Sequence, residues 1–224
     1  LPTSVEQVQQ IVRICRRHSV PVVARGSGTG LSGGALPVAG GLLLVLSRLD
    51  EILEVDPRRG LVRVQPGVTN LAVSEAAAPY GMYYAPDPSS QVACSVGGNV
   101  AENSGGVHCL KYGLTVHNVL AVKLVTMEGE LLTLGSETGE TPGLNLLAAV
   151  IGSEGLLGIV VEVTVRLLPI PRRVELLLAA FDDVGRCAEA VGQVIAAGII
   201  PAGLEMMDAP AIRAAEAFAG CGYP

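Results

Sequence analysis

The sequence predicts an α+β fold in two parts, a large first domain and the beginning of a second. Three observations support this prediction. Segments with the apolar spacing of helices alternate with short β-type runs along the chain. Half of the 224 residues are hydrophobic, which is enough to bury a sizeable core. The segment Pro169-Ile170-Pro171 interrupts the pattern, and a β-type run and a helical run begin again after it.

The first helix is predicted directly after Ser4, which can cap it, because apolar residues recur at helical spacing from Val8 to Cys15. A strand over 20–25, a glycine-rich loop and an apolar run over 42–47 follow. The elements up to the proline boundary are then strands over 52–56 and 61–65, a helix over 70–78 ending at Pro79, strands over 119–126 and 131–134, a short helix over 144–151 and a strand over 159–167.

Two further segments complete this outline. The stretch 83–113 is rich in glycine, proline, asparagine and serine, and a stretch of this kind inside a compact domain is more often functional than idle. Beyond the proline boundary, a strand over 174–181 and a helix over 184–197 open the second α/β domain. We expect that second domain to be truncated, because the chain ends soon after the helix.

Composition excludes several classes of protein. A net charge of −6, 3% aromatic residues and no tryptophan argue against binding to nucleic acid, which needs clustered basic residues and stacking rings. No apolar run approaches the ~20 residues of a membrane span, and no signal peptide is predicted. The five cysteines are scattered, which predicts reduced thiols and no metal site. The chain lacks an initial methionine, so we expect a fragment of a longer protein.

The glycine-rich loop contains Gly28-Thr29-Gly30-Leu31-Ser32-Gly33, which matches the dinucleotide motif G-x-G-x-x-G after a strand. In a Rossmann fold, a helix begins at once after this motif, so that its N-terminus meets the pyrophosphate. Here Gly34 to Gly41 contains proline and three glycines and leads into a β-type run. The Rossmann interpretation therefore fails on its context.

The loop still has the chemistry of an anion cradle. Successive glycines allow backbone N–H groups to converge on a diphosphate, and Thr29 and Ser32 add hydroxyl donors. A plain glycine-rich hairpin fits the spacing of the loop equally well.

Four blocks in order resemble the FAD-linked oxidases of the vanillyl-alcohol oxidase type, and the resemblance extends over essentially the whole chain. Within that family the chain is most similar to the FAD-bearing glycolate oxidase branch. The blocks are Arg25 to Ala35, Ala85-Pro86-Asp87-Pro88-Ser89, Ser95 to Gly106, and Gly152-Ser153-Glu154-Gly155-Leu156-Leu157-Gly158-Ile159.

The resemblance implies a PCMH-type FAD-binding domain over 1–171, made of a lobe over about 1–60 and a lobe over about 61–171, with FAD extended between them. Residues 172–224 would begin the substrate (cap) domain. The residues that the resemblance assigns to the cofactor are Arg25, Gly26, Ser27, Gly28, Thr29, Gly30, Leu31, Ser32, Gly33, Gly34, Pro86, Asp87, Ser89, Ser95, Gly97, Gly98, Asn99, Ala101, Asn103, Gly105, Gly106, Glu154, Gly155, Gly158, Ile159 and Val160.

The same resemblance implies oxidation of a short 2-hydroxy acid, glycolate or D-lactate, to the 2-oxo acid, with hydride passing to flavin N5. Electrons would go on to a non-NAD acceptor or to a partner subunit with iron–sulfur clusters. It implies a cytoplasmic protein, which partner subunits could hold at the inner face of the membrane. The alternative is a non-catalytic FAD-binding or assembly subunit of the same complex. The catalytic base is expected in the C-terminal part, outside these residues.

Several polar residues are weighed individually. His108 and Cys109 follow the flavin-lining block, and His108 could orient a carboxylate substrate or tune the flavin, although a simple loop histidine is favoured. His117 is expected to be structural. Asn145 stands where relatives carry aspartate, which leaves the role of that turn open. No histidine or cysteine stands at a position where covalent attachment to the flavin is expected, so FAD is expected to bind non-covalently.

Overall fold

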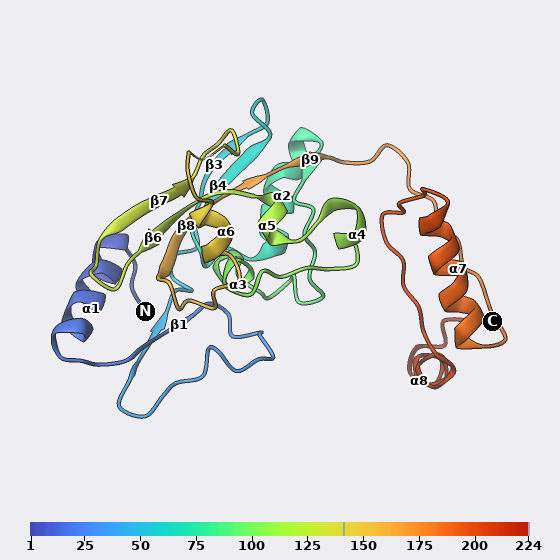
Figure 1. Ribbon diagram of the computed structural model, residues 1–224, viewed down its shortest axis with the longest axis horizontal. Helices are drawn as coiled ribbons and strands as arrows, with labels where there is room; N and C mark the ends of the chain where they lie inside the picture. Colours follow the sequence, from blue (N-terminus) through green and yellow to red (C-terminus); the bar gives the residue numbers. More distant parts are fainter. Residues whose placement is uncertain (141, 224) are drawn as a thin grey trace.

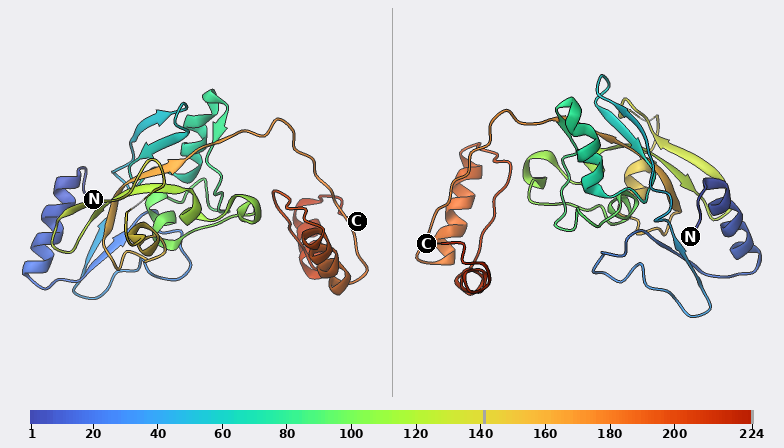
Figure 2. Two further views of the ribbon diagram at one scale, coloured as in Figure 1. Left: turned by 45° about the horizontal axis from the view of Figure 1, so that its top comes forward. Right: turned by 180° about the vertical axis from the view of Figure 1, so that it is seen from behind.

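The computed structural model describes residues 1–140 and 142–223, and confirms a mixed α/β protein. Most of the secondary structure up to β9 (Leu168–Pro169) forms one packed body (Figure 1). An extended segment then leads to two helices that stand beside this body (Figure 2). The site described below lies within the packed body.

The N-terminal part places one helix beside a pair of parallel strands. Helix α1 (Val5–Arg17) begins where the Ser4 hydroxyl accepts a hydrogen bond from Gln7 N at 3.3 Å, which confirms the predicted cap. Strand β1 (Val22–Arg25) pairs in parallel with β2 (Leu42–Val45). No helix lies between these two strands, so the exclusion of a Rossmann fold is confirmed.

The centre of the molecule is a five-stranded antiparallel sheet in the order β3-β4-β8-β6-β7. Its strands are β3 (Ile52–Asp56), β4 (Leu61–Val64), β6 (Val119–Val125), β7 (Leu131–Gly135) and β8 (Ile159–Arg166). All five were predicted from the sequence within one or two residues. Since β3 pairs with β4, segment 52–56 joins this sheet.

Helices cover one face of the sheet and enclose the larger apolar core. They are α2 (Asn70–Ala77), the 3₁₀ turn η1 (Ala78–Tyr80), α3 (Val96–Glu102), α5 (Thr115–Asn118) and α6 (Leu146–Val150). Val73 of α2 and Val96 of α3 are fully buried against Val122 of β6 and Val163 of β8. A smaller core joins α1 to β2 and to the ends of β6 and β8. Burial of these side chains supplies the main stabilisation of the body.

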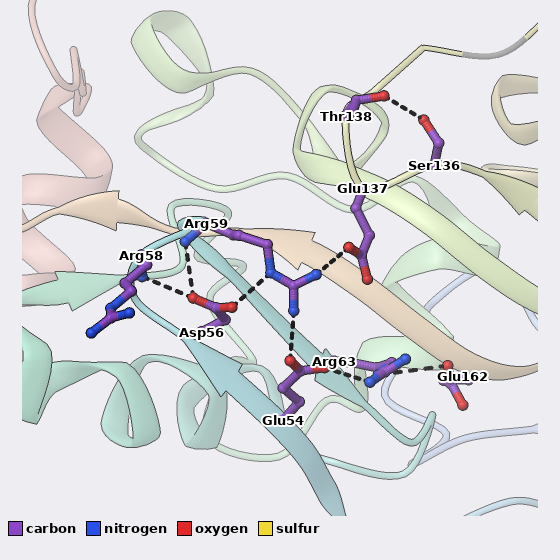
Figure 3. A network of polar contacts seen from close by, with 9 residues as sticks. All are labelled: Glu54, Asp56, Arg58, Arg59, Arg63, Ser136, Glu137, Thr138 and Glu162. Carbon is purple, nitrogen blue, oxygen red and sulfur yellow. Dashed lines mark hydrogen bonds and ion pairs between the residues drawn. The ribbon is translucent and has the colours of Figure 1, made fainter.

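The opposite side of the sheet carries charged residues that pair with one another across the strands (Figure 3). Arg63 of β4 contacts Glu54 of β3, and Lys123 of β6 contacts Glu162 of β8 at 2.9 Å. Arg63, Lys123 and Glu162 each lie between two buried apolar residues of their strand, as expected for a sheet with one solvated face.

The segment from Tyr83 to Gly113 contains more regular structure than the sequence predicted. Short strand β5 (Met82–Tyr83) pairs with β9, and two helices follow, α3 and α4 (Cys109–Tyr112). Helix α3 was not predicted because Gly97 and Gly98, poor helix formers, occupy its first turn. Loop carbonyls hold that turn: Val96 N donates to Val68 O and Gly97 N to Pro66 O, both at 2.8 Å.

The C-terminal part consists of α7 (Val184–Ala196) and α8 (Ala209–Ala219). The prediction of α7 is confirmed, and α8 was not predicted. The predicted strand over 174–181 is wrong, because this segment is extended but has no strand partner in the described part of the chain. Neither helix has a buried residue, in contrast to the helices of the packed body.

Candidate cofactor-binding site

A cleft lies where the glycine-rich loop, α3 and the turn before β8 come together. It has two adjoining hollows, of about 450 and about 60 Å³, which share Gly26, Gly98, Ala101 and Glu154 in their walls. The larger hollow follows the glycine-rich loop, and the smaller one reaches towards β8. The glycine-rich loop and the turn before β8, which are more than a hundred residues apart in the sequence, therefore form one site.

The glycine-rich loop leaves β1 at Arg25 and forms one wall. Gly28 has a φ of +73°, which side chains rarely adopt, and the guanidinium of Arg25 packs where a Cβ of Gly28 would lie. Much of the loop is exposed, with Leu31 fully so. The loop therefore presents its backbone to the cleft, with Arg25 behind it.

Helix α3 forms the facing wall and approaches the loop closely. The Ser95 hydroxyl caps the helix by accepting from Gly98 N at 3.4 Å. A Cβ on Gly26 would collide with Ser95, and a Cβ on Gly97 would lie 3.1 Å from the carbonyl oxygen of Pro66. Only glycine lets the three backbone segments meet at these distances.

Asn99 gives the cleft a buried hydrogen-bond donor. Its side chain is 2% exposed and lines the larger hollow, and its Nδ2 has no partner among the described residues. A buried amide without a partner costs about 1–3 kcal/mol, so native proteins seldom keep one unless a ligand or water satisfies it. Asn99 therefore points to a ligand with an acceptor atom.

The charges in the cleft are few. Among the described residues that line it, Arg25 is the one cation, and Glu102 and Glu154 are carboxylates. Glu102 Oε1 lies 3.3 Å from the Cβ position of Gly30, and Glu154 Oε2 lies 3.4 Å from that of Gly34. An anionic ligand here would be held by backbone N–H groups and Arg25, with both carboxylates at its border.

Most of the residues that the resemblance assigned to the cofactor line the two hollows. Those that do not are Ser32, Gly33, Pro86, Asp87, Asn103, Gly105 and Gly106. Several of these shape the wall from behind. Pro86 O accepts from the buried Asn70 Nδ2 at 3.0 Å, and Asn103, with a φ of +51°, accepts from Val116 N at 2.9 Å. Asn103 thus holds the loop through its Oδ1.

Other lining residues escaped the sequence-based assignment. They are Ala24, Ala35, Leu46, Pro66, Ser90, Cys94, Glu102, Ser104, Val150 and Ser153. Most are small or apolar, so residue type carries no signal of a site. Their positions next to the assigned blocks were the one available signal, and Leu46, Pro66 and Val150 lack even that.

Two residues with open roles now have local explanations. His117 Nδ1 accepts from Leu114 N at 3.0 Å, which supports a structural role. Asn145 caps α6 by accepting from Ala148 N at 3.1 Å, a role that aspartate could equally fill. All five cysteines are free, and the part of the chain that the structure describes contains no metal-ligand cluster and no helix able to span a bilayer.

The fold and the glycine-lined cleft are those of a domain that binds a nucleotide cofactor outside a Rossmann fold. The chain belongs to the FAD binding domain family, whose model matches residues 1–135. The model of the FAD linked oxidases, C-terminal domain, matches residues 170–224. FAD is therefore the cofactor of this domain.

Known proteins agree with this assignment. The chain is 61% identical over all 224 residues to glycolate oxidase subunit GlcD of Escherichia coli (strain K12), and covers 45% of that protein. It is 36% identical to a D-lactate dehydrogenase of Anaerostipes hadrus, over 97% of this chain and 46% of the relative. A solved alkyldihydroxyacetonephosphate synthase has a TM-score of 0.75 at 25% identity, over 90% of this chain and 38% of that one. The chain thus spans about half the length of these curated relatives.

The cleft fits FAD on its own evidence. The diphosphate needs N–H donors, which the backbone of the loop from Gly26 to Gly34 offers beside the larger hollow, and a cation, which Arg25 offers in the wall of the smaller one. The flavin and ribityl groups carry acceptor atoms for the unpartnered Asn99 Nδ2. A planar ring system needs backbone without side chains beside it, and Gly97 and Gly98 provide that in α3.

Proposed function

We propose that this chain is the FAD-binding part of an enzyme that oxidises a short 2-hydroxy acid, glycolate or D-lactate, to the 2-oxo acid. The observation that carries the proposal is 61% identity over the whole chain to a glycolate oxidase subunit. The glycines of the cleft support a working cofactor site, since a Cβ at Gly26 would collide with Ser95 and a Cβ at Gly97 with Pro66. Bound FAD would supply the two-electron acceptor, with hydride arriving at N5.

Within this proposal, the residues of the chain bind and orient. The loop from Gly26 to Gly34 and Arg25 hold the diphosphate. Asn99 donates to the flavin or ribityl, while Pro86 and the loop after α3 shape the wall. Glu154 to Val160 close the other end of the cofactor. Non-covalent attachment is part of the proposal; acid precipitation of the yellow protein should release the flavin into the supernatant.

The remaining expectations concern the larger assembly. The 61% identical relative is named as a subunit, and we propose partner subunits here as well, one of them carrying iron–sulfur clusters that take the electrons. We propose a cytoplasmic location, with attachment to the membrane through those partners. We also propose a domain boundary after residue 171; limited proteolysis should cut first in the exposed segment that precedes α7.

Absorption spectroscopy of the full-length protein tests the function. Purified protein should show a flavin spectrum that bleaches when glycolate or D-lactate is added without oxygen. A flavin spectrum that neither acid bleaches would favour the non-catalytic binding or assembly subunit. A colourless protein that binds NADH would contradict the cofactor assignment. Residues 1–224 alone should bind flavin but not turn over glycolate, so dye reduction by this fragment would contradict the placement of the substrate residues.

A further inference from the structure

Part of the wall of the larger hollow is a segment without helix or strand. Residues 84–94 follow β5 and contribute Ser89, Ser90 and Cys94 to the lining of the hollow. The first half of this segment, 84–88, contains no turn and pairs with no strand in the part of the chain that the structure describes. The second half consists mainly of turns. Contacts from outside the segment must therefore fix the positions of its residues in the wall.

Helix α2 supplies side-chain contacts to the first half of the segment. Asn70 Nδ2 donates to Pro86 O at 3.0 Å. The Ser74 hydroxyl accepts from Tyr84 N at 3.1 Å and donates to Tyr84 O at 3.3 Å. Since Asn70 and Ser74 are four residues apart, both lie on the same face of the helix. These two side chains thus pair with backbone groups that would otherwise need a neighbouring strand or water.

The first backbone amides of α2 hold the second half of the segment. Asn70 N donates to Cys94 O and Leu71 N donates to Gln91 O, both at 3.0 Å. The first N–H groups of a helix have no carbonyl of their own helix to bind, so the helix and the segment satisfy each other here. Asn70 therefore holds the segment at two places, at Pro86 through its side chain and at Cys94 through its amide.

Helix α2 has no residue in the lining of either hollow. Asn70 is 1% exposed, and the helix itself is anchored in the larger core. Elsewhere along the segment, Gly106 packs on the backbone of Asp87, and His108 Nδ1 lies 2.6 Å from Asp87 Oδ2. The polar groups of α2 can therefore influence a bound cofactor only through the segment that they hold.

We propose that Asn70 and Ser74 are positioning residues of the FAD site, which hold the segment 84–94 where bound FAD meets it. Their hydrogen bonds fix the backbone that carries Ser89 and Ser90 in the wall of the larger hollow. Without these bonds the glycine-rich loop and α3 would still bind FAD, but more weakly and with less defined surroundings for the cofactor. The inference rests on FAD as the cofactor and holds whichever acid the enzyme oxidises.

Titration of the flavin-free, full-length protein with FAD tests the proposal, at a temperature well below that of unfolding. Ser74→Ala removes both bonds to Tyr84 and should raise the dissociation constant of FAD by about tenfold. The visible circular dichroism of the bound flavin should change as well, because it depends on the asymmetry of the flavin's surroundings. Asn70→Leu should act in the same direction. Ser74→Thr keeps the hydroxyl and should keep the wild-type affinity and spectrum.

Asn118→Leu is the matched control for Asn70→Leu. Asn118 is also a buried asparagine, and its Nδ2 donates at 2.9 Å to the carbonyl oxygens of Tyr112 and Leu114, which line neither hollow. The control should lower the melting temperature of the flavin-free protein, as Asn70→Leu does, because both substitutions leave buried carbonyls without a donor. It should leave FAD affinity and the flavin spectrum unchanged.

Three results would overturn the inference. Unchanged FAD affinity and flavin spectrum in Ser74→Ala and Asn70→Leu would show that their hydrogen bonds serve folding alone. Equal weakening of FAD binding by Asn118→Leu would assign the effect to a general loss of stability. Weakening by Ser74→Thr as large as that by Ser74→Ala would exclude the hydroxyl as the positioning group. None of these measurements uses a substrate, so failure of glycolate and D-lactate to reduce the flavin would remove the proposed function and leave this inference standing.

Discussion

The two sides of the central sheet handle polar groups in opposite ways. On the solvated face, Arg59 contacts Glu54, Asp56 and Glu137, and every one of these charges has a partner (Figure 3). In the cleft, Arg25 lines the smaller hollow, Glu102 lines the larger one and Glu154 lines both, and the buried Asn99 Nδ2 has no partner among the described residues. The solvated face therefore has more charged residues than the cleft, but these residues already pair with one another and leave no group free for a ligand.

This difference separates structural from functional polar groups. Exposed ion pairs such as those of Arg59 contribute little to stability and are satisfied within the chain. The cleft instead keeps an unsatisfied buried donor, which lowers the stability of the ligand-free protein. It also keeps several glycines, each of which loses more backbone entropy on folding than another residue would. A charge map alone would have directed attention to the wrong side of the molecule. The predictions below test the contrast, beginning with the largest expected effect.

Gly97→Val should have the largest effect, because the new side chain would meet Pro66, whose Cβ is 2.6 Å and whose carbonyl oxygen is 3.1 Å from the Cβ position. Overpacking of this kind costs about 1–3 kcal/mol, so α3 should move and FAD affinity should fall by about 10- to 100-fold. Flavin fluorescence titration measures the affinity and thermal unfolding measures the strain. Gly192→Ala, in α7 with nothing within 4 Å, is the control; it should leave FAD affinity unchanged and should not lower the melting temperature. A Gly97→Val protein with normal FAD affinity would contradict the close-contact argument.

Asn99→Leu should separate stability from function. Without FAD, the substitution removes a buried donor that has no partner, so the free energy of unfolding should stay equal or rise. With FAD, a hydrogen bond is lost and affinity should fall by about tenfold. Asn70→Leu provides the contrast, because its Nδ2 already donates to Pro86 O, and it should destabilise the FAD-free protein by about 1–3 kcal/mol. Equal destabilisation by both substitutions would show that Asn99 is satisfied within the protein.

The sequence predicted much of this fold because its signals were local. The Ser4 cap, the alternating valines of β4 and β8 and the apolar run of β6 each depend on residues next to one another. The cradle was predicted as well, since a loop that must bring backbone N–H groups together carries its glycines in sequence. The four blocks and their order then identified the cofactor as FAD through the family resemblance.

The features that the sequence did not predict correctly have a common physical cause: each depends on residues that are distant in the sequence. Helix α3 starts on glycines because carbonyls of Pro66 and Val68 fix its first amides, and no local propensity reveals this. Segment 174–181 is an apolar run of strand length, but it lacks a neighbouring strand in the described chain. The same holds within the site. Leu46, Pro66 and Val150 line the cleft because of the fold, without any motif of their own.

Arg59→Gln should have a small effect confined to the solvated face. It removes the guanidinium that joins Glu54, Asp56 and Glu137, all of them on the surface, so the loss of stability should be small and should disappear at high salt. Thermal unfolding at low and high salt measures it, and FAD affinity should not change. Arg58→Gln is the control, because the side chain of Arg58 points away from the network in Figure 3. A loss of FAD affinity in Arg59→Gln would show that the two sides of the sheet are coupled.

Asp56→Asn tests the smallest expected effect, the dependence of stability on pH. Backbone and side-chain hydrogen bonds from Arg59 lower the pKa of Asp56 from its ordinary value of 3.8. Since the folded pKa lies below the unfolded one, the contribution of Asp56 is complete above about pH 4 and is lost as the pH falls through the folded value. Asp56→Asn should therefore reduce the fall in melting temperature between neutral and acidic pH. Asp50→Asn, at an exposed carboxylate without a hydrogen-bond partner in the described chain, should keep the wild-type slope. Identical slopes in all three proteins would mean that the turn from Asp56 to Gly60 holds without the charge.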